Sequence, residues 1–219
     1  MREDVVAIVP AGGRSRRLQG LVAPGGKAAL MVDGESLLAR VCRVLATVAD
    51  VVVVAAPGQL LPELPPGIDL ILDREPDRGP LVAIRDGLAH AIAIRRPSPR
   101  VALLAACDLP WITEGLARGL IDAVGDSGGR WAVPMIDGHP QVLLSALSVD
   151  LWPAFEQAAA GDRPSLRDLL ARLAAHDPDA VRMISPAELA AWTGDLRAFA
   201  DVDTPADLEG LGPRGFSPS

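Results

Sequence analysis

Cysteine is nearly absent from this sequence, and other signals of well-known protein classes are missing with it. Cys42 and Cys107 are the only cysteines among 219 residues, and they stand in unrelated contexts. Neither a disulfide framework nor a zinc-binding pattern can be built from them. Basic residues are also fewer than acidic ones: the chain has 21 Lys and Arg against 28 Asp and Glu, which gives a formal net charge of −7. This balance argues against a nucleic-acid-binding protein, which usually presents a broad basic face.

Long apolar runs are missing as well. No apolar stretch approaches the roughly 20 residues that a helix needs to cross a bilayer. Met1–Asp4 lack the basic and then apolar pattern of a signal peptide. Hydrophobic residues still make up 49% of the chain against 22% charged residues, which is enough for a full core. We therefore expect a soluble, cytoplasmic protein with neither a membrane nor a nucleic acid as its partner.

Short aliphatic runs alternate with segments of helical spacing along almost the whole chain. The runs predict strands at Val5–Val9, Val51–Ala55, Ile68–Leu72, Val101–Ala106, Trp131–Pro134, Val142–Ser145 and Ala180–Ile184. The spacing predicts helices at Leu37–Ala46, Pro80–Ile94, Glu114–Val124, Leu151–Ala159 and Leu166–Ala175. This order predicts an α/β fold, a single doubly wound Rossmann-like domain with a mostly parallel sheet. We expect the domain to span residues 1–211 and residues 212–219 to form a disordered tail.

Residues suited to chemistry follow three of the predicted strands. A loop with two glycines and three arginines, residues 11–17, follows the first strand. Asp73 follows the third strand and Asp108 the fourth. Ligands of such sheets bind outside the carboxyl ends of the strands, so all three places fall on one edge of the sheet. A binding site is therefore expected at that edge.

The loop 11–17 has the composition of a phosphate site. Gly12 and Gly13 let backbone N–H groups approach a ligand closely, and the three arginines supply forked donors for phosphate oxygens. The loop matches neither the Gly-x-Gly-x-x-Gly of dinucleotide sites nor the Walker pattern. Taken alone, it fits a strand-to-helix turn with solvated arginines equally well.

A series of segments carries a resemblance to a known family. The segments are AGGRSRRL, KAALMVDGESLL, DREPDRGPLVAIRDGL, AACDLPWI, DGHPQVLLSAL and FADVDTPADL, and the series covers most of the chain between Val5 and Leu208. In this order they are similar to the signature of the molybdenum cofactor guanylyltransferase, or MobA-like, branch of the nucleotidyltransferases. The resemblance implies the fold of nucleotide-diphospho-sugar transferases.

The resemblance implies a reaction as well. The phosphate of molybdopterin or Mo-molybdopterin attacks the α-phosphorus of GTP, pyrophosphate leaves, and the guanine dinucleotide form of the cofactor results. Such a reaction needs alignment and positive charge on a crowded polyanion more than covalent help from the protein. Mg²⁺ is the implied cofactor, GTP and molybdopterin are the implied partners, and proteins that insert the molybdenum cofactor are further partners that the resemblance allows.

Matched position by position, the resemblance assigns roles to residues of this chain. The implied GTP-binding residues are Ala11, Gly12, Gly13, Lys27, Asp73 and Asp108, the catalytic residues Arg17, Lys27 and Asp108, the metal ligands Asp108 and Asp203, and the pterin-binding residues His139, Gln141 and Asp201. One departure is Gly26, because the family has Asp directly before this lysine and a shorter loop ahead of it. The placement of Lys27 is therefore open.

Simpler interpretations stay open for the same residues. Lys27 fits a solvated loop lysine, because lysine is usually exposed. Asp73 fits a turn residue, and Asp108 fits an N-cap before Pro110. The structure has to decide between these interpretations and the functional ones.

The function also has alternatives. Asp201 and Asp203 replace two asparagines of the family motif, and the Asp-x-Asp form also occurs in the cytidylyltransferase branch. CTP could then take the place of GTP, or a sugar or alditol phosphate that of molybdopterin. A non-catalytic carrier of nucleotide or cofactor is a further alternative. The segments Ala11-Gly12-Gly13 and Gly79-Pro80-Leu81 favour GTP, and Asp108 favours an enzyme.

Overall fold

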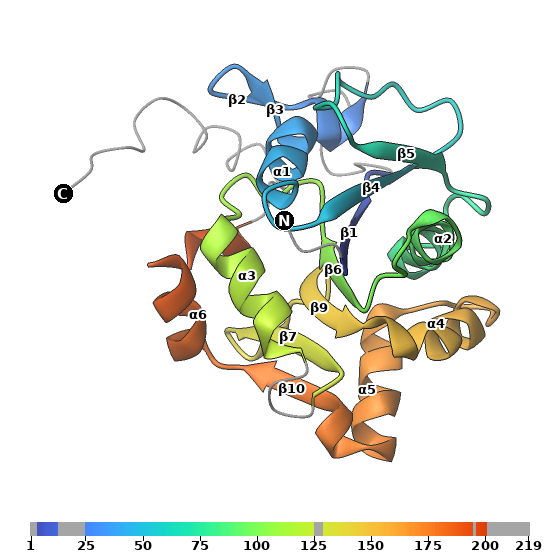
Figure 1. The fold of residues 1–219 in the computed structure, drawn as a ribbon, viewed down its shortest axis with the longest axis vertical. Helices are drawn as coiled ribbons and strands as arrows, with labels where there is room; N and C mark the ends of the chain where they lie inside the picture. Colours follow the sequence, from blue (N-terminus) through green and yellow to red (C-terminus); the bar gives the residue numbers. More distant parts are fainter. Residues whose placement is uncertain (1–3, 13–24, 125–128, 195, 201–219) are drawn as a thin grey trace.

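A central β-sheet with helices on both faces forms the body of the protein (Figure 1). The structure is a computed structural model and describes residues 4–12, 25–124, 129–194 and 196–200. Its strands are β1 (Val5–Pro10), β2 (Met31–Val32), β3 (Glu35–Ser36), β4 (Asp50–Ala55), β5 (Asp69–Leu72), β6 (Val101–Ala105), β7 (Trp131–Ile136), β8 (His139–Pro140), β9 (Leu144–Ser148) and β10 (Val181–Ile184). The sheet has the order β10-β7-β9-β6-β1-β4-β5, with β8 paired to β7, and β2 and β3 form a separate hairpin.

The strands at the centre of the sheet are buried aliphatic runs. β1 is buried at every position and pairs in parallel with β4 on one side and β6 on the other. A strand buried on both faces shows no polar alternation, which is typical of parallel sheets. β5 and β10 also pair in parallel with their neighbours, β4 and β7. β9 differs, because it runs antiparallel to both β6 and β7.

The helices follow the predicted pattern closely. They are α1 (Leu37–Leu45), α2 (Pro80–Ile94), α3 (Glu114–Ala123), α4 (Trp152–Ala159), α5 (Leu166–His176) and α6 (Pro186–Thr193), with 3-10 turns η2 (Gly26–Ala29), η3 (Val149–Leu151), η4 (Pro178–Ala180) and η5 (Arg197–Phe199). Ser36, Thr113, Ser165 and Ser185 each cap a helix, because their hydroxyls accept a backbone N–H of its first turn. The first turn of α2 carries Pro80, as its position in the sequence predicted.

Two apolar cores lie on opposite faces of the sheet. α1, α3 and α6 cover one face, and α2, α4 and α5 cover the other (Figure 1). Alternate residues of β1 belong to the two cores. On the second face α2 approaches β1 closely, because a Cβ added at Gly87 would lie 2.6 Å from Cγ2 of Ile8. A glycine at this place in α2 is therefore a packing requirement.

The predicted α/β fold with a mostly parallel sheet is confirmed, with a correction at β9. A strand was expected at Val142–Ser145, whereas β9 is Leu144–Ser148 and antiparallel. The chain first makes a turn, in which the N–H of Leu144 donates to the carbonyl of Gln141 at 3.1 Å. This turn delays the start of the strand.

Several short elements were not predicted. The β2–β3 hairpin and β8 are two-residue strands, too short to leave a periodic pattern. α6 did leave a signal, because Ser185 and Glu188 form a capping box and Pro186 follows the cap. The predicted boundary at residue 211 and the tail 212–219 lie outside the described residues.

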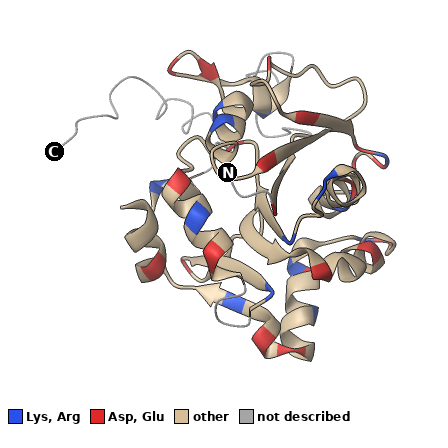
Figure 2. Cartoon of the chain, in the orientation of Figure 1, with Lys and Arg blue, Asp and Glu red and all other residues tan. Residues whose placement is uncertain are grey.

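Charges of both signs mix on the surface of the described part. Acidic and basic residues are interspersed along α3 and α5, for example (Figure 2). Among the helices that the structure describes, none combines the length and apolar character that a bilayer span requires.

Candidate active site

The carboxyl ends of β1, β4 and β6 meet at one edge of the sheet, as the sequence predicted. The chain leaves β1 there at Ala11, whose N–H donates to the carbonyl of Val54 in β4 at 2.8 Å. A cavity of about 250 Å³ opens at this edge. Its lining includes Ala11, Gly12, Lys27 and Asp108. The structure thus brings together four of the residues that were expected to bind nucleotide.

An ion pair lies in the wall of this cavity. Nζ of Lys27 is 2.9 Å from Oδ2 of Asp108, although 81 positions separate the two residues in the sequence. Their side chains are only 18% and 15% exposed. Charges attract more strongly away from water than at the surface. The cavity therefore presents a cation and an anion side by side, both within reach of a small ligand.

The identity of the basic residue is informative. Lys27 is the only lysine among the 21 lysine and arginine residues of the chain, and all the others are arginines. Lysine provides a compact point charge, whereas arginine provides a broad planar fork. The one lysine of the sequence thus gives the cavity a compact cation. This compositional signal was present in the sequence and was overlooked there.

Glycine at position 25 places Lys27. Its φ of +117° lies in the left-handed region that favours glycine. A Cβ at this position would lie 2.8 Å from the carbonyl oxygen of Leu60. The turn η2, which carries Lys27, begins at the next residue, Gly26. The departure from the family pattern at Gly26 therefore does not keep the lysine out of the cavity.

Gln59 joins the ends of β1 and β4 at the rim of the cavity. Its Oε1 accepts the N–H of Ala56 at 3.1 Å, and its Nε2 donates to the carbonyl of Ala11 at 2.8 Å. Gly12 lies beside this bridge, where a Cβ would be 3.5 Å from the nitrogen of Ala56. Sequence reasoning missed Gln59, because a glutamine in a proline-rich loop carries no distinguishing pattern.

Asp108 does not cap the helix that follows it. α3 begins at Glu114, and its cap is Thr113, whose hydroxyl accepts the N–H of Leu116 at 3.2 Å. The interpretation of Asp108 as an N-cap is therefore wrong. Burial raises the pKa of its neighbour Cys107 to about 12, which disfavours the nucleophilic thiolate at neutral pH.

Arg40 of α1 connects the segment of Lys27 with the segment of Asp108. Its Nε donates to the carbonyl of Pro110 at 3.0 Å, two residues beyond Asp108. Its Nη1 lies 3.6 Å from the carboxylate of Asp33, in the hairpin that follows the turn of Lys27. Sequence reasoning did not single out this arginine, because its partners come from separate loops.

We expect Arg40→Met to lower the free energy of unfolding by about 1–3 kcal/mol, because the carbonyl of Pro110 loses its donor. Arg43→Met on the same helix is the matched control. Arg43 pairs with Glu35 at an exposed position, and its loss should cost under about 1 kcal/mol. Urea unfolding of both variants makes the comparison, and equal losses would show that Arg40 does not support the loop.

Asp73 lies at the end of β5, farther along the same edge. Its N–H donates to the carbonyl of Ala55 at 2.8 Å, and its Oδ1 accepts the N–H of Glu75 at 2.9 Å, so it does form a turn. The residue is 8% exposed. Burial raises the pKa of its carboxyl group, and the nearby charge of Asp86 adds to the rise. Among described residues, those that line the cavity of Lys27 do not include Asp73.

A second cavity, of about 310 Å³, adjoins the first. Both are lined by Asp108 and Leu143, so Asp108 stands where the two meet. The second lining also includes Arg167 of α5 and Gln141, which was expected to bind the pterin. His139, expected beside it, lies exposed on β8 and is outside the lining that the described residues form.

Some predicted site residues fall outside the described part of the chain. They are Gly13, Arg17, Asp201 and Asp203, and their roles stay predictions. Within residues 4–12, 25–124, 129–194 and 196–200, no group of three His, Cys, Asp or Glu side chains is placed to hold a metal ion. Asp108 is therefore the described carboxylate on which a metal site at this edge would depend.

Comparison with known protein families shows to which family the chain belongs. A family model described as "MobA-like NTP transferase domain" matches residues 7–182, which include Lys27, Asp73 and Asp108. The chain belongs to the MobA-like NTP transferase family. The family that the sequence segments resemble is thereby confirmed.

Relatives of this MobA-like NTP transferase are similar to it in sequence or in structure over nearly the full chain. The molybdenum cofactor guanylyltransferase of Rhodopseudomonas palustris (strain HaA2) is 31% identical over 215 residues, which cover 95% of this chain and 92% of the relative. The crystal structure of molybdopterin-guanine dinucleotide biosynthesis protein A from Archaeoglobus fulgidus superposes with a TM-score of 0.72 at 20% identity, over 94% of this chain and 96% of that one. The structure of 2-C-methyl-D-erythritol 4-phosphate cytidylyltransferase from Thermus thermophilus superposes with a TM-score of 0.67 at 19% identity, over 95% of this chain and 97% of that one. At such identities the two structures establish the shared fold.

Proposed function

We propose that this protein is a molybdenum cofactor guanylyltransferase. It transfers GMP from GTP to the phosphate of molybdopterin or Mo-molybdopterin, releases pyrophosphate and forms molybdopterin guanine dinucleotide. A relative with this name, 31% identical over 95% of the chain, supports the proposal. The observation that carries it is the ion pair between Lys27, which lines the first cavity, and Asp108, which lines both cavities.

The first cavity suits the triphosphate of GTP. Gly12 lets the ligand approach the backbone, and Lys27 supplies a positive charge beside it. The carboxylate of Asp108 lies 2.9 Å from that charge. Phosphate oxygens would replace this carboxylate as a partner of Lys27 and free Asp108 for another cation.

The chemistry of Asp108 fits a magnesium ion. Mg²⁺ in phosphate-transfer sites is held by one or two carboxylates, and phosphates and water complete its six ligands. Asp108 would supply one carboxylate, and we assign the second to Asp203, outside the described residues. A bound Mg²⁺ would neutralise charge on the transferring phosphate and on the pyrophosphate that leaves.

The second cavity suits the pterin acceptor. Arg167 is exposed and makes no ion pair with any described residue, so its guanidinium is available for the acceptor phosphate. Gln141 adds an amide group, and Leu143 and Leu144 add an apolar wall for a flat ring system. Because both cavities reach Asp108, the acceptor phosphate and the α-phosphate of GTP can be held next to each other. Such alignment accounts for much of the rate in phosphoryl transfer.

Incubation with each nucleoside triphosphate, Mg²⁺ and molybdopterin tests the proposal. We expect pyrophosphate release with GTP and a guanine dinucleotide product, identified by mass spectrometry. Release with CTP alone would reassign the protein to cytidylyl transfer. Nucleotide binding without any release, in the presence of molybdopterin or sugar and alditol phosphates, would support a carrier instead of an enzyme.

We expect GTP with Mg²⁺ to raise the melting temperature more than CTP, ATP or UTP do, because the Ala11-Gly12-Gly13 and Gly79-Pro80-Leu81 segments favour guanine. At a hundredfold excess over the dissociation constant, a ligand stabilises the folded state by about 2.7 kcal/mol. Thermal melts at equal nucleotide concentrations measure the difference. A larger shift with CTP would contradict the assignment of the base.

A further inference from the structure

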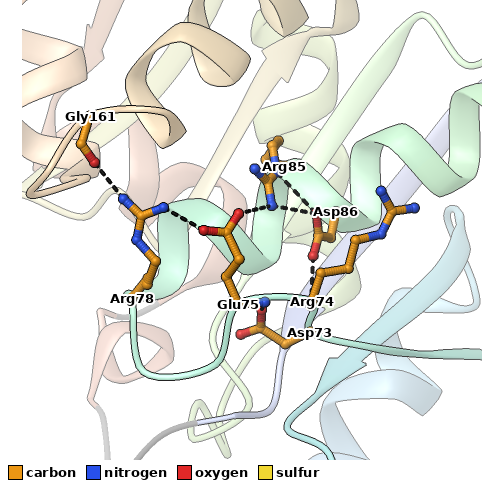
Figure 3. Close-up of polar contacts among 7 residues, drawn as sticks. All are labelled: Asp73, Arg74, Glu75, Arg78, Arg85, Asp86 and Gly161. Atoms are coloured by element: carbon orange, nitrogen blue, oxygen red, sulfur yellow. Dashed lines mark hydrogen bonds and ion pairs between the residues drawn. The ribbon is translucent and has the colours of Figure 1, made fainter.

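A buried carboxylate on α2 holds the loop that carries Asp73. Asp86 is 3% exposed, and each of its carboxylate oxygens has a donor (Figure 3). Oδ2 accepts the backbone N–H of Arg74 at 3.0 Å, and Oδ1 accepts the Nε–H of Arg85 at 3.0 Å. Asp86 thus binds the residue directly after Asp73.

Glu75 extends these contacts to another part of the chain. Its carboxylate accepts hydrogen bonds from Arg78 and, at 3.1 Å, from Arg85 (Figure 3). Both bonds lower the pKa of Glu75, so it is ionised at neutral pH. Arg78 also donates to the carbonyl of Gly161, in the loop between α4 and α5. The loop 73–79 is therefore fastened to α2 and to the α4–α5 loop.

The burial of Asp86 needs a reason. A carboxylate that leaves water loses its hydration, and an apolar side chain of similar size would fill the same helix face without that loss. In some proteins a buried ionic group is retained because it specifies one conformation. Here the specified part is the loop that presents Asp73.

Asp73 has a carboxylate oxygen to offer a ligand. Its Oδ1 accepts the N–H of Glu75, and its Oδ2 makes no hydrogen bond to any described residue. A carboxylate repels phosphate and accepts N–H groups, so it suits the base of a nucleotide. Guanine carries two adjacent N–H donors, at N1 and at its amino group. Cytosine carries one amino group beside two acceptors, which a carboxylate would repel.

We propose that Asp86 is a positioning residue for nucleotide selection. By holding the N–H of Arg74, it fixes the carboxylate of Asp73 for the two N–H donors of guanine and so favours GTP over CTP. This inference rests on the proposed function, because it takes the ligand to be a nucleoside triphosphate.

The test compares Asp86→Asn with the wild type in kcat/KM for GTP and for CTP, on the full chain. The two donors use different oxygens of Asp86, and in asparagine one of these oxygens becomes an NH2 group, which faces a donor and cannot accept from it. We expect the preference for GTP over CTP to fall about tenfold. The fall should come from a higher KM for GTP, with kcat nearly unchanged. An unchanged preference overturns the proposal.

Gly87→Ala is the matched control for an effect of stability alone. Its Cβ would meet Ile8 at 2.6 Å, so the variant disturbs the packing of α2 on β1 without changing a contact of the loop 73–79. We expect a lower melting temperature and a wild-type preference for GTP. If this variant shifts the preference as much as Asp86→Asn, the effect is one of stability and the proposal fails.

A double variant tests whether Asp86 acts through Asp73. Asp73→Asn should lose the preference for GTP by itself, and adding Asp86→Asn should then change it by less than about twofold. Independent, additive losses overturn the proposal. If Asp86→Asn does not fold, Glu75→Gln at the exposed end of the same contacts takes its place. A fall of about two- to threefold is then expected, and no fall overturns the proposal.

Failure of the proposed function would look different. If the wild type transfers no nucleotide at all, guanylyl transfer is refuted. The ratio of GTP to CTP dissociation constants, measured by calorimetry on the same variants, then tests Asp86. A wild-type ratio in Asp86→Asn would overturn the positioning role alone.

Discussion

Asp108→Asn is expected to slow guanylyl transfer about 10²–10³-fold at saturating GTP, because the site loses the charge that would hold Mg²⁺. Asparagine keeps the size of aspartate and one acceptor oxygen. The melting temperature of the nucleotide-free protein should change by no more than about 4 °C, the effect of about 1 kcal/mol in a chain of this size. The cap of α3 is Thr113, so the start of that helix does not depend on Asp108.

The same variant should separate binding from turnover. In the wild type, GTP has to displace Asp108 from its position 2.9 Å from Nζ of Lys27. In Asp108→Asn that competing charge is gone. We therefore expect the affinity for GTP without Mg²⁺ to equal or exceed that of the wild type, although transfer is slow. Transfer assays across a Mg²⁺ titration, with GTP binding and melts beside them, measure all three quantities.

Asp150→Asn is the matched control for this loss of charge. Asp150 is exposed in η3, which follows β9 at the opposite edge of the sheet, where Ser148 pairs with the first residue of β6, Val101. Its transfer rate should equal that of the wild type. Near-normal turnover of Asp108→Asn would remove Asp108 from the site, and with it most of the case for metal-dependent transfer.

Lys27→Met is expected to lower kcat/KM for GTP by about 10²–10³-fold, because the phosphates lose their compact cation. Methionine retains much of the apolar length of lysine. The attraction between Lys27 and phosphate is screened by salt, so the difference from the wild type should be largest at low ionic strength and shrink as salt is added. Initial rates at several GTP and salt concentrations measure both effects.

Two further observations show whether charge or shape matters at position 27. Lys27→Arg keeps the charge and changes its geometry, so its activity should lie between those of the wild type and Lys27→Met. An amine-reactive label should modify Lys27, the only lysine side chain in the sequence, and GTP should protect it. A strongly lowered melting temperature of nucleotide-free Lys27→Met, with unchanged GTP affinity, would support a purely structural turn instead.

The edge of the sheet that carries the site was predictable, because buried parallel strands appear in the sequence as short aliphatic runs. β1 and β6 are aliphatic runs that end shortly before Gly12 and Asp108, so both residues had to lie near the carboxyl ends of buried strands. The direction of β9 was missed, although the sequence holds a signal for it. Asp137 and Gly138, both at positive φ, reverse the chain between β7 and β8, and Asp-Gly is a favoured hairpin turn. β9 continues in the direction of β8, because both strands pair antiparallel with β7.

The contacts inside the site could not be predicted, for a different reason. Lys27 reaches Asp108 because Gly25 adopts a left-handed conformation against the carbonyl of Leu60. That arrangement depends on two loops distant in the sequence, and neither loop carries a pattern that predicts contact with the other. Asp86 likewise looks like an ordinary helical aspartate until the fold brings the loop after β5 onto α2.

The antiparallel course of β9 sets the segment beside the proposed acceptor cavity apart from the helical crossovers of the sheet. The segment from β7 through β8 to β9 turns back along β7, because β8 and β9 both pair antiparallel with it. Its length can therefore change without altering any helical crossover, whereas Lys27 and Asp73 sit in connections that end at such helices. Pro140, Gln141 and Val142 of this segment line the second cavity and not the first, so residues 137–142 are where we expect a change of acceptor to leave the proposed nucleotide cavity intact.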